Sequence, residues 1–164
     1  FSGAKFYDVK THITLLINGW DDSSEYQELV GLADLPTTLV DTVGLNIPEN
    51  YHGDSLRQLV FNKDWERTSV AGGYSDPEGE CFHIRTDGWN LMTYPNAEDK
   101  LYYLREDPSE QKNVVTQYPD KEAELRDQLS NHKQLVRSTE RGHVTRPNLS
   151  EDARARLRRP GYDE

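Results

Sequence analysis

Cysteine is almost absent from this sequence, since Cys81 is the only one in 164 residues. A single thiol excludes an internal disulfide and any zinc site built from several thiolates. Long hydrophobic runs are also lacking, and no stretch approaches the ~18 apolar residues of a membrane span. Basic residues are too few to favour nucleic acid or an anionic membrane as a partner, with 19 Lys and Arg against 29 Asp and Glu.

The residues that are present are sufficient for one domain with a core. The mean hydropathy of -0.89 is low, but three Trp and nine Tyr argue against a disordered chain. The net charge of -10 is typical of proteins from high-salt environments and also arises by ordinary drift. Because the sequence starts at Phe1 without a signal-peptide pattern, we expect a piece of a longer protein and leave its localisation open.

Two elements are predicted in the first part of the chain. Residues 12–18 contain five successive apolar or β-branched residues and are predicted to form a strand covered on both faces, although the chain offers no neighbouring strands for it. A helix is predicted over residues 35–43, with Asp34 as N-cap and Gly44 as its stop. We expect its apolar face to dock on a core, because it gathers Leu35, Leu39, Val40 and Val43.

From residue 68 the pattern changes to short alternating strands. Asp87-Gly88 separates two alternating runs, which is a strong hairpin signal. With a further strand at residues 101–104, it predicts an antiparallel sheet of three or four strands with one buried face. A helix is predicted over residues 122–136, because its apolar residues recur on one side, and a last short helix over residues 151–158.

Three stretches together resemble the C-terminal part of sulfatases, which are members of the alkaline-phosphatase-like superfamily. G-L-A-D-L-P-T-T-L-V-D-T-V-G at residues 31–44 and G-D-S-L at residues 53–56 are similar to the family's D-L-x-P-T-L-L-D-L-A-G helix and the G-x-S-L after it. Residues 87–91 and 101–113 are similar to its D-G-x-K-L and E-L-Y-D-L-x-x-D-P-x-E-x-x-N. The end, L-R-R-P-G-Y at residues 157–162, is similar to a closing L-x-x-L-G-Y.

This resemblance implies an α/β fold, the C-terminal portion of an alkaline-phosphatase-like sulfatase fold. It would comprise a late strand of the large sheet, a small antiparallel β-sheet subdomain and a packing C-terminal helix. Residues 1–66 would end the catalytic α/β domain, residues 67–136 would form the C-terminal subdomain, and residues 137–164 would form a polar tail with a short helix. We therefore expect a segment of a sulfuric ester hydrolase that is inactive by itself.

The resemblance also implies the chemistry of the complete enzyme. In sulfatases the nucleophile is a hydrated formylglycine, made from the Cys or Ser of a C/S-x-P/A-S-R motif. A divalent cation, commonly calcium, is held by carboxylates and an Asn. Both would lie before Phe1, so we expect no cofactor in this chain and name the N-terminal part of the same enzyme as its partner. The implied substrate is a small-molecule or carbohydrate sulfate ester.

Few residues of the chain itself are candidates for a catalytic site. Cys81 and Arg85 have the spacing of the formylglycine motif, but His83 and Ile84 replace its Pro or Ala and its Ser, so we interpret Cys81 as a structural thiol. The five histidines are too dispersed for a metal site. Asp34 and Glu110 are interpreted as a helix cap and as turn chemistry.

Lys5 is the one candidate substrate-binding residue. Sulfatases often place a sulfate-contacting Lys just before a Y-E-x-x-x-R-x-P-L-I strand, which residues 7–16 resemble with His12 and Thr14 in place of Arg and Pro. The family Lys commonly lies four residues before the Tyr, where this chain has Gly3, and Lys5 lies two before Tyr7. A solvated loop lysine is therefore the favoured interpretation of Lys5, and the sulfate contact is the alternative.

Two other functions remain open at this point. A phosphodiesterase or phosphonate-ester hydrolase of the same superfamily shares the fold and differs in the nucleophile. A non-catalytic binding module descended from such an enzyme is the second. The sequence before Phe1 would separate them, because it carries either the formylglycine motif, a Thr or Ser nucleophile, or a start codon.

Overall fold

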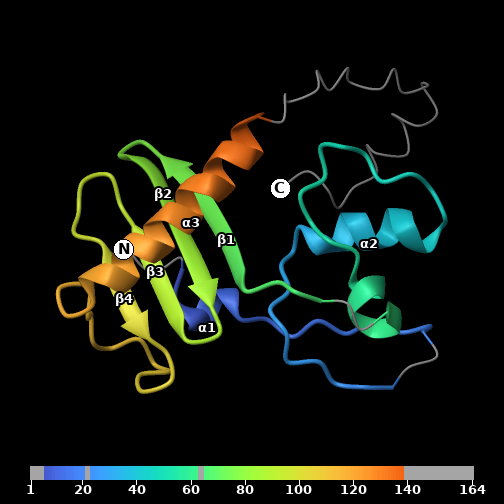
Figure 1. Cartoon of the computed structure of the whole chain (residues 1–164), viewed down its shortest axis with the longest axis horizontal. Coiled ribbons are helices and arrows are strands. Elements are labelled where there is room, and N and C mark those ends of the chain that lie inside the picture. The colour runs from blue at the N-terminus through green and yellow to red at the C-terminus, as the bar shows by residue number, and fades with distance from the viewer. Residues whose placement is uncertain (1–5, 21–22, 63–64, 139–164) are drawn as a thin grey trace, which may run out of the picture.

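The computed structural model describes residues 6–20, 23–62 and 65–138 (Figure 1). Four strands form one antiparallel sheet in the order β1-β2-β3-β4, which confirms the predicted sheet. The elements in chain order are α1 (Asp8–Thr11), α2 (Asp34–Thr42), the π-helical turn η2 (Gln58–Asn62), β1 (Ser69–Asp76), β2 (Gly79–Thr86), β3 (Trp89–Thr93), β4 (Lys100–Tyr103) and α3 (Pro119–Ser138).

Tight turns set the register of the sheet. Residues 77–78 connect β1 to β2, and Asp87 and Gly88 connect β2 to β3, as the Asp-Gly signal predicts. Gly79, which opens β2, has a φ of 134°, a backbone conformation that side chains disfavour. Across the second hairpin Arg85 pairs with Asn90, so both side chains lie on the same face of the sheet.

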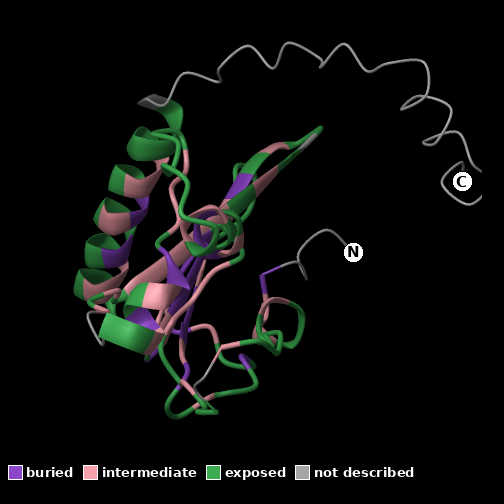
Figure 2. Ribbon diagram, turned by 90° about the vertical axis from the view of Figure 1, so that its right-hand side faces the viewer, coloured by how far each residue is buried: buried purple, intermediate pink, exposed green. Residues whose placement is uncertain are grey.

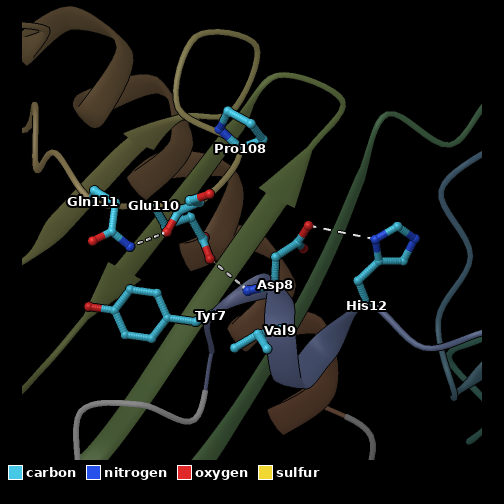
Figure 3. Close-up of a pocket in the computed structure, with 8 residues that line it drawn as sticks. Tyr7, Asp8, Val9, His12, Pro108, Glu110 and Gln111 are labelled. Carbon is cyan, nitrogen blue, oxygen red and sulfur yellow. Dashed lines mark hydrogen bonds and ion pairs between the residues drawn. The ribbon is translucent and has the colours of Figure 1, made fainter.

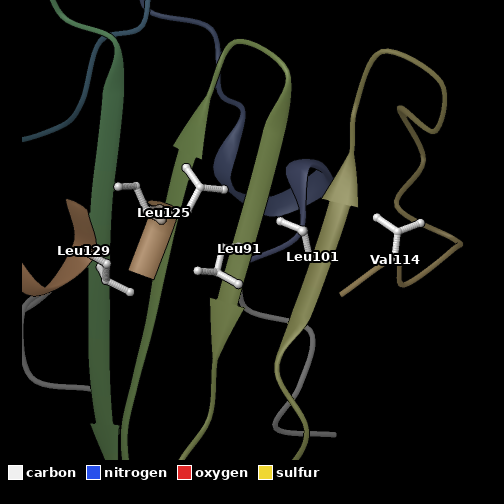
Figure 4. Packing of buried hydrophobic residues seen from close by; sticks show 6 residues of the cluster. Leu91, Leu101, Val114, Leu125 and Leu129 are labelled. Atoms are coloured by element: carbon white, nitrogen blue, oxygen red, sulfur yellow. The ribbon is translucent and has the colours of Figure 1, made fainter. Parts of the chain in front are cut away.

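One face of the sheet packs against α3 (Figure 4). Ile84, Leu91 and Leu101 from the strands meet Leu125 and Leu129 from the helix, and all five are at most 1% exposed. Burial of each such side chain stabilises the fold by roughly 1.5–3 kcal/mol. The helix predicted over residues 122–136 is confirmed, and it begins earlier because proline is tolerated in a first helical turn.

The second face of the sheet is also covered, so the expectation of a single buried face is wrong. Phe6 packs there against Cys81 and Met92, in a cluster that also contains Tyr102 and Leu104. Figure 2 shows buried residues on the strands between α3 and the N-terminal segment. The strands therefore direct side chains into two apolar layers, and Phe6, which covers the second layer, lies 75 positions before Cys81 in the sequence.

The strand predicted over residues 12–18 is not formed here. These residues have no regular structure, and Ile13 and Leu16 are 58% and 88% exposed. A strand needs a neighbour to pair with its N–H and C=O groups. All the strands that the structure describes belong to the sheet of residues 69–103, and residues 12–18 are not paired with any of them.

The structure has helix α2 at the predicted position but shows a different buried face. Leu39 and Val43 are 67% and 68% exposed, so their predicted docking on a core is wrong. The buried side chains are Asp34, Thr37 and Thr38, which are polar. Leu35 and Val40 are only partly buried, so the hydrogen bonds of the buried polar side chains contribute much of what holds this helix in place.

Two of the predicted features lie outside the described residues, the short helix over residues 151–158 and the closing motif. Among the helices of the described ranges, none combines the length and the apolar character needed to cross a membrane.

Candidate functional site

Two buried polar clusters stand out in the described residues, and the first surrounds Asp34. The side chain of Asp34 is fully buried and accepts hydrogen bonds from the backbone N–H groups of Gly31 and Asp54, at 2.7 and 2.8 Å. It also accepts both arms of Arg67, at 2.5 and 2.8 Å. Asp34 thus joins three segments of the chain through four hydrogen bonds, and its interpretation as a helix N-cap is wrong.

Arg67 completes the charge balance of this cluster. Its side chain is 15% exposed and also contacts the carboxylate of Asp54. Burial by itself would lower the pKa of Arg67, but the hydrogen bonds to Asp34 and Asp54 outweigh burial and raise it. The guanidinium therefore stays charged between the two carboxylates.

Two further contacts join α2 to the loop after it. Thr38 Oγ1 donates to the carbonyl of Asp34 at 2.6 Å and accepts from the N–H of Leu56 at 2.9 Å. Ser55 Oγ donates to Asp41 at 2.5 Å. Gly53 lies so close to α2 that a Cβ there would be 2.0 Å from the carbonyl oxygen of Ala33. The motif pieces at residues 31–44 and 53–56 therefore act as one structural unit.

The second cluster lies between the N-terminal segment and the sheet (Figure 3). Glu110 is 4% exposed and accepts hydrogen bonds from the N–H of Asp8 and from Asn90 Nδ2, both at 2.6 Å. Asn90 is fully buried, and its Nδ2 also donates to the carbonyl of Phe6 at 3.2 Å. The carboxylate of Asp8 forms an ion pair with Arg85 on β2. These contacts fasten residues 6–8 to the sheet, so Glu110 does more than shape a turn.

Tyr7 extends this cluster along the sheet. Its hydroxyl lies 3.1 Å from that of Tyr102 and 2.9 Å from Lys100 Nζ. Burial would raise the pKa of Tyr7, but the hydrogen bonds with Lys100 and Tyr102 and the charge of Lys100 together outweigh burial and lower that pKa. Burial raises the pKa of Tyr102, and the hydrogen bond to Tyr7 raises it further. Lys100 thus favours a negative charge on Tyr7 rather than on Tyr102.

A pocket of about 580 Å³ opens between α1 and residues 108–111. Its polar groups are largely occupied, because Asp8 faces Arg85 and lies 3.6 Å from His12 Nδ1, and Glu110 is buried in the hydrogen bonds described above. The pocket therefore presents no nucleophile paired with a base.

Among the histidines of the described residues, His83 has the most strongly shifted pKa. It stacks on Phe6 with ring centroids 4.5 Å apart, and burial, together with the charge of Arg85, lowers its pKa to about 4 against a weaker opposing effect of Asn90. In the described residues, His83 Nδ1 and Asn90 Oδ1 are buried without a hydrogen-bond partner. A neutral imidazole is therefore the form that this site accommodates.

The residues singled out from the sequence do not converge. Lys5 lies outside the described residues. Cys81 is 4% exposed in β2, within the cluster around Phe6 and Met92. Across residues 6–20, 23–62 and 65–138, no three His, Cys, Asp or Glu side chains are grouped to hold a metal ion. The described residues therefore do not fit the calcium site or the formylglycine that the resemblance implies.

Sequence reasoning missed the roles of Arg67, Asn90 and Glu110. The motifs themselves contained the available signal. D-L-P-T contains Asp34, and G-D-S-L contains Asp54, whose N–H donates to Asp34. D-P-x-E contains Glu110, and D-G-x-x-L contains Asn90, which donates to Glu110. Reading each piece alone assigned Asp34 to a cap and Glu110 to a turn. Both assignments ignored partners that lie 20 or more positions away.

Both clusters lie within a region of the chain that matches a known protein family. The family described as "N-sulphoglucosamine sulphohydrolase, C-terminal" matches residues 6–139, which include both. Arylsulfatase K of Xenopus laevis is 27% identical over 143 residues, which cover 76% of this chain and 26% of that protein. The chain thus spans about a quarter of the length of the curated relatives it matches.

Solved structures agree on the fold. A protein in complex with its substrate D-glucosamine-2-N,6-O-disulfate has a TM-score of 0.57 and 24% identity, over 65% of this chain and 24% of that one. Phosphonate monoester hydrolase from Silicibacter pomeroyi has a TM-score of 0.54 and 22% identity, over 62% of this chain and 24% of that one.

Proposed function

We propose that this chain, which belongs to the family of N-sulphoglucosamine sulphohydrolase C-terminal domains, serves as the C-terminal part of an enzyme that hydrolyses sulfate esters. The match over residues 6–139 is the observation that carries the proposal. It includes the Asp34 cluster, the antiparallel sheet and α3, so sequence family and architecture agree. The activity belongs to the complete protein, because the chain corresponds to about a quarter of its relatives.

The N-terminal part of the same enzyme is the proposed partner of two apolar surfaces. The first is the outer side of α2 and the loop after it, where Leu39, Val43 and Leu45 are at least 65% exposed. The second is the segment of residues 12–18, which we propose to be the late strand of the large sheet in the complete protein. Covering both would remove apolar side chains and unpaired backbone groups from water. This assignment supports the division into residues 1–66, 67–136 and 137–164.

The nucleophile and the metal are proposed to come from that N-terminal part. The only cysteine is buried in β2, and Asp34 already makes four hydrogen bonds, so neither suits those roles. A formylglycine would supply the nucleophilic hydroxyl and a calcium ion would bind the sulfuryl oxygens when both are present. This chain would contribute Lys5 near the sulfate, two residues before Tyr7.

A sulfated sugar is the proposed substrate class. The family name and one structural neighbour both refer to sulfated glucosamine, as N-sulphoglucosamine and as D-glucosamine-2-N,6-O-disulfate. Phosphonate ester hydrolysis is the second candidate, since phosphonate monoester hydrolases share this fold. The two activities differ in the nucleophile, which lies beyond this chain. A non-catalytic module remains the third possibility.

The decisive experiment is an assay of the complete protein and of this chain. The complete protein should release sulfate from an aryl sulfate and from glucosamine 6-sulfate, whereas the purified 164-residue chain should release none. Faster turnover of a phenyl phosphonate than of either sulfate ester would instead assign the phosphonate activity. Turnover by the chain alone that survives Cys81→Ala would overturn the proposed division of labour.

A further inference from the structure

Residues 6–8 form a short strap across the sheet, on the face away from α3. The carbonyl of Phe6 accepts a hydrogen bond from Asn90 Nδ2 at 3.2 Å. The N–H of Asp8 donates to Glu110 at 2.6 Å (Figure 3), and the carboxylate of Asp8 pairs with Arg85 on β2. Each of these contacts uses a side chain of the sheet or of the loop after it. The strap is therefore held on the sheet without being one of its strands.

The imidazole of His83, on β2, lies beneath this strap. It stacks on the ring of Phe6, with centroids 4.5 Å apart and an interplanar angle of 18°. On the β1 side, a Cβ at Gly72 would lie 3.0 Å from its Nε2. Among the described residues, His83 Nδ1 and Asn90 Oδ1 are buried without a hydrogen-bond partner. The imidazole is thus enclosed between the strap and the sheet, next to the amide that holds Phe6.

The surroundings of His83 favour its neutral form. Burial is the largest effect on its pKa, Asn90 opposes burial, and the charge of Arg85 on the same side of β2 adds to it, which leaves the pKa at about 4. An imidazolium here would have a buried N–H group and a guanidinium nearby, which is costly without water. The other titratable groups around the strap and His83 are Tyr7 and Asp8 on the strap, Tyr74 on β1, Cys81 on β2 and Glu110 after β4.

We propose that residues 6–8 and His83 form an acid-operated latch, in which protonation of the imidazole releases the strap from the sheet. Lifting Phe6 exposes the buried Nδ1 to water, so the open form accommodates the imidazolium and the closed form does not. The bonds of Phe6 to Asn90 and of Asp8 to Glu110 close the latch again when the proton leaves. The apolar layer under α3 contains no residue of the strap, so it stays packed in both forms. This inference does not depend on the proposed function.

The expected size of the effect follows from the linkage between proton binding and opening. His83 titrates at about 4 under the strap, and near its ordinary 6.5 once the strap has lifted. The open form therefore binds the proton first as the pH falls, and the closed form is favoured again as the pH rises. Between pH 7 and pH 5 the ratio of open to closed protein should increase about 20-fold.

Cys81 provides the measurement, because it is 4% exposed in the layer that Phe6 covers. In the complete protein, dithiodipyridine labels this thiol only when the strap has lifted, and mass spectrometry locates the label. The labelling rate is divided by the rate at the same pH in protein unfolded by urea, so that it measures the open fraction. We expect this normalised rate to rise about 20-fold from pH 7 to pH 5. The amides of α3 should remain protected from hydrogen exchange over the same range.

Three variants separate the imidazole from other titrating groups. His83→Gln should lose most of the rise, because an amide takes up no proton in this range. His12→Gln is the matched control, since that side chain is 76% exposed just after α1, and it should keep the rise. Glu110→Gln should keep the rise as well, because the carboxylate is not the trigger.

The latch is overturned if His83→Gln shows the same rise as the wild type, or if only Glu110→Gln abolishes it. A normalised rate that stays constant in the wild type overturns it without any variant. Loss of α3 protection together with Cys81 labelling also overturns it, because the acid would then unfold the whole subdomain rather than lift the strap.

Discussion

The carboxylate of Asp34 and the guanidinium of Arg67 form a two-armed ion pair between residues 33 positions apart. Asp34 lies at the start of α2 and Arg67 lies two residues before β1, so the pair joins the helical part of the chain to the sheet. Both side chains are largely withdrawn from water, and Asp34 completely so. A buried charge pair of this kind costs much to break, because the remaining charge is left without its partner.

Asp34→Asn should therefore be strongly destabilising. The amide leaves the charge of Arg67 without its buried partner. In either orientation it also places an NH₂ group against an Arg67 nitrogen and a backbone N–H, that of Gly31 or that of Asp54. We expect a loss of roughly 3–5 kcal/mol in the free energy of unfolding, measured by urea denaturation. Asp87→Asn is the control, since its pair with Arg105 is exposed to solvent and should contribute little to stability. Equal effects of the two substitutions would show that the Asp34 cluster is not a stabilising anchor.

Gly53→Ala should destabilise the chain through a clash rather than through lost contacts. The new Cβ would lie 2.0 Å from the carbonyl oxygen and 2.3 Å from the carbonyl carbon of Ala33, which are backbone atoms. We expect a loss of at least ~2 kcal/mol in the free energy of unfolding. Gly19→Ala has no atom within 4 Å of its Cβ and meets only the strain of a φ of 100°, about 1 kcal/mol. A smaller loss at Gly53 than at Gly19 would contradict the close packing of the two motif pieces.

His83 should make stability fall as the pH is lowered. Its pKa in the folded state is about 4, below the value of 6.5 in the unfolded chain, so the unfolded state binds the proton first. The contribution is complete above pH 6.5, declines as the pH falls toward 4, and amounts to roughly 3 kcal/mol at most. Unfolding free energies of wild type and His83→Gln, compared at pH 7 and pH 4.5, isolate this effect from the carboxylates.

The control for His83 is His12→Gln, because the His12 side chain is 76% exposed. On acidification, His83→Gln should lose less stability than His12→Gln, which keeps the buried imidazole of His83. Parallel curves for all three proteins would mean that the His83 imidazole takes up a proton as easily in the fold as outside it.

Lys5→Ala should lower kcat in the complete enzyme if Lys5 contacts the sulfuryl oxygens. Removal of one preorganised contact to developing charge typically costs ~10²–10³-fold in kcat. The melting temperature should remain near that of the wild type if the role of Lys5 is to bind substrate and not to stabilise the fold. Lys10→Ala is the matched control, since Lys10 is exposed in α1. Wild-type kinetics in both variants would identify Lys5 as a solvated loop residue.

Local patterns predicted the sheet and its main helix well. Asp87-Gly88 forms the hairpin that it predicts, and α3 contains the predicted residues 122–136 because the spacing of Leu125 and Leu129 already specifies an apolar face. These predictions hold because a turn and an amphipathic helix depend on residues that are close together in the chain. The resemblance to sulfatases is confirmed for the same reason, since its motifs are local strings of residues.

The predictions that differ from the structure concern which segments pair or pack with each other. The sequence of residues 12–18 does not indicate whether another strand lies beside them. None of the described strands is paired with this segment. Leu39 and Val43 have the spacing of a docking face, but Asp34, Thr37 and Thr38 are the side chains that α2 buries. Hydrophobic spacing shows which residues share a face, whereas burial also requires a second surface to meet it.

The sequence alone determined the antiparallel sheet and the helix that follows it, the Asp-Gly turn of the sheet, the apolar side of α3 and membership of the sulfatase family. Only the tertiary structure decided which groups the buried carboxylates bind. Asp34 accepts hydrogen bonds from Arg67, and Glu110 accepts them from Asp8 and Asn90, across separations of 20 to 102 residues. A carboxylate can cap a helix, turn a loop or anchor a distant segment, and its chemistry is the same in each case. Which of these it does depends on the donors that folding brings within hydrogen-bond distance.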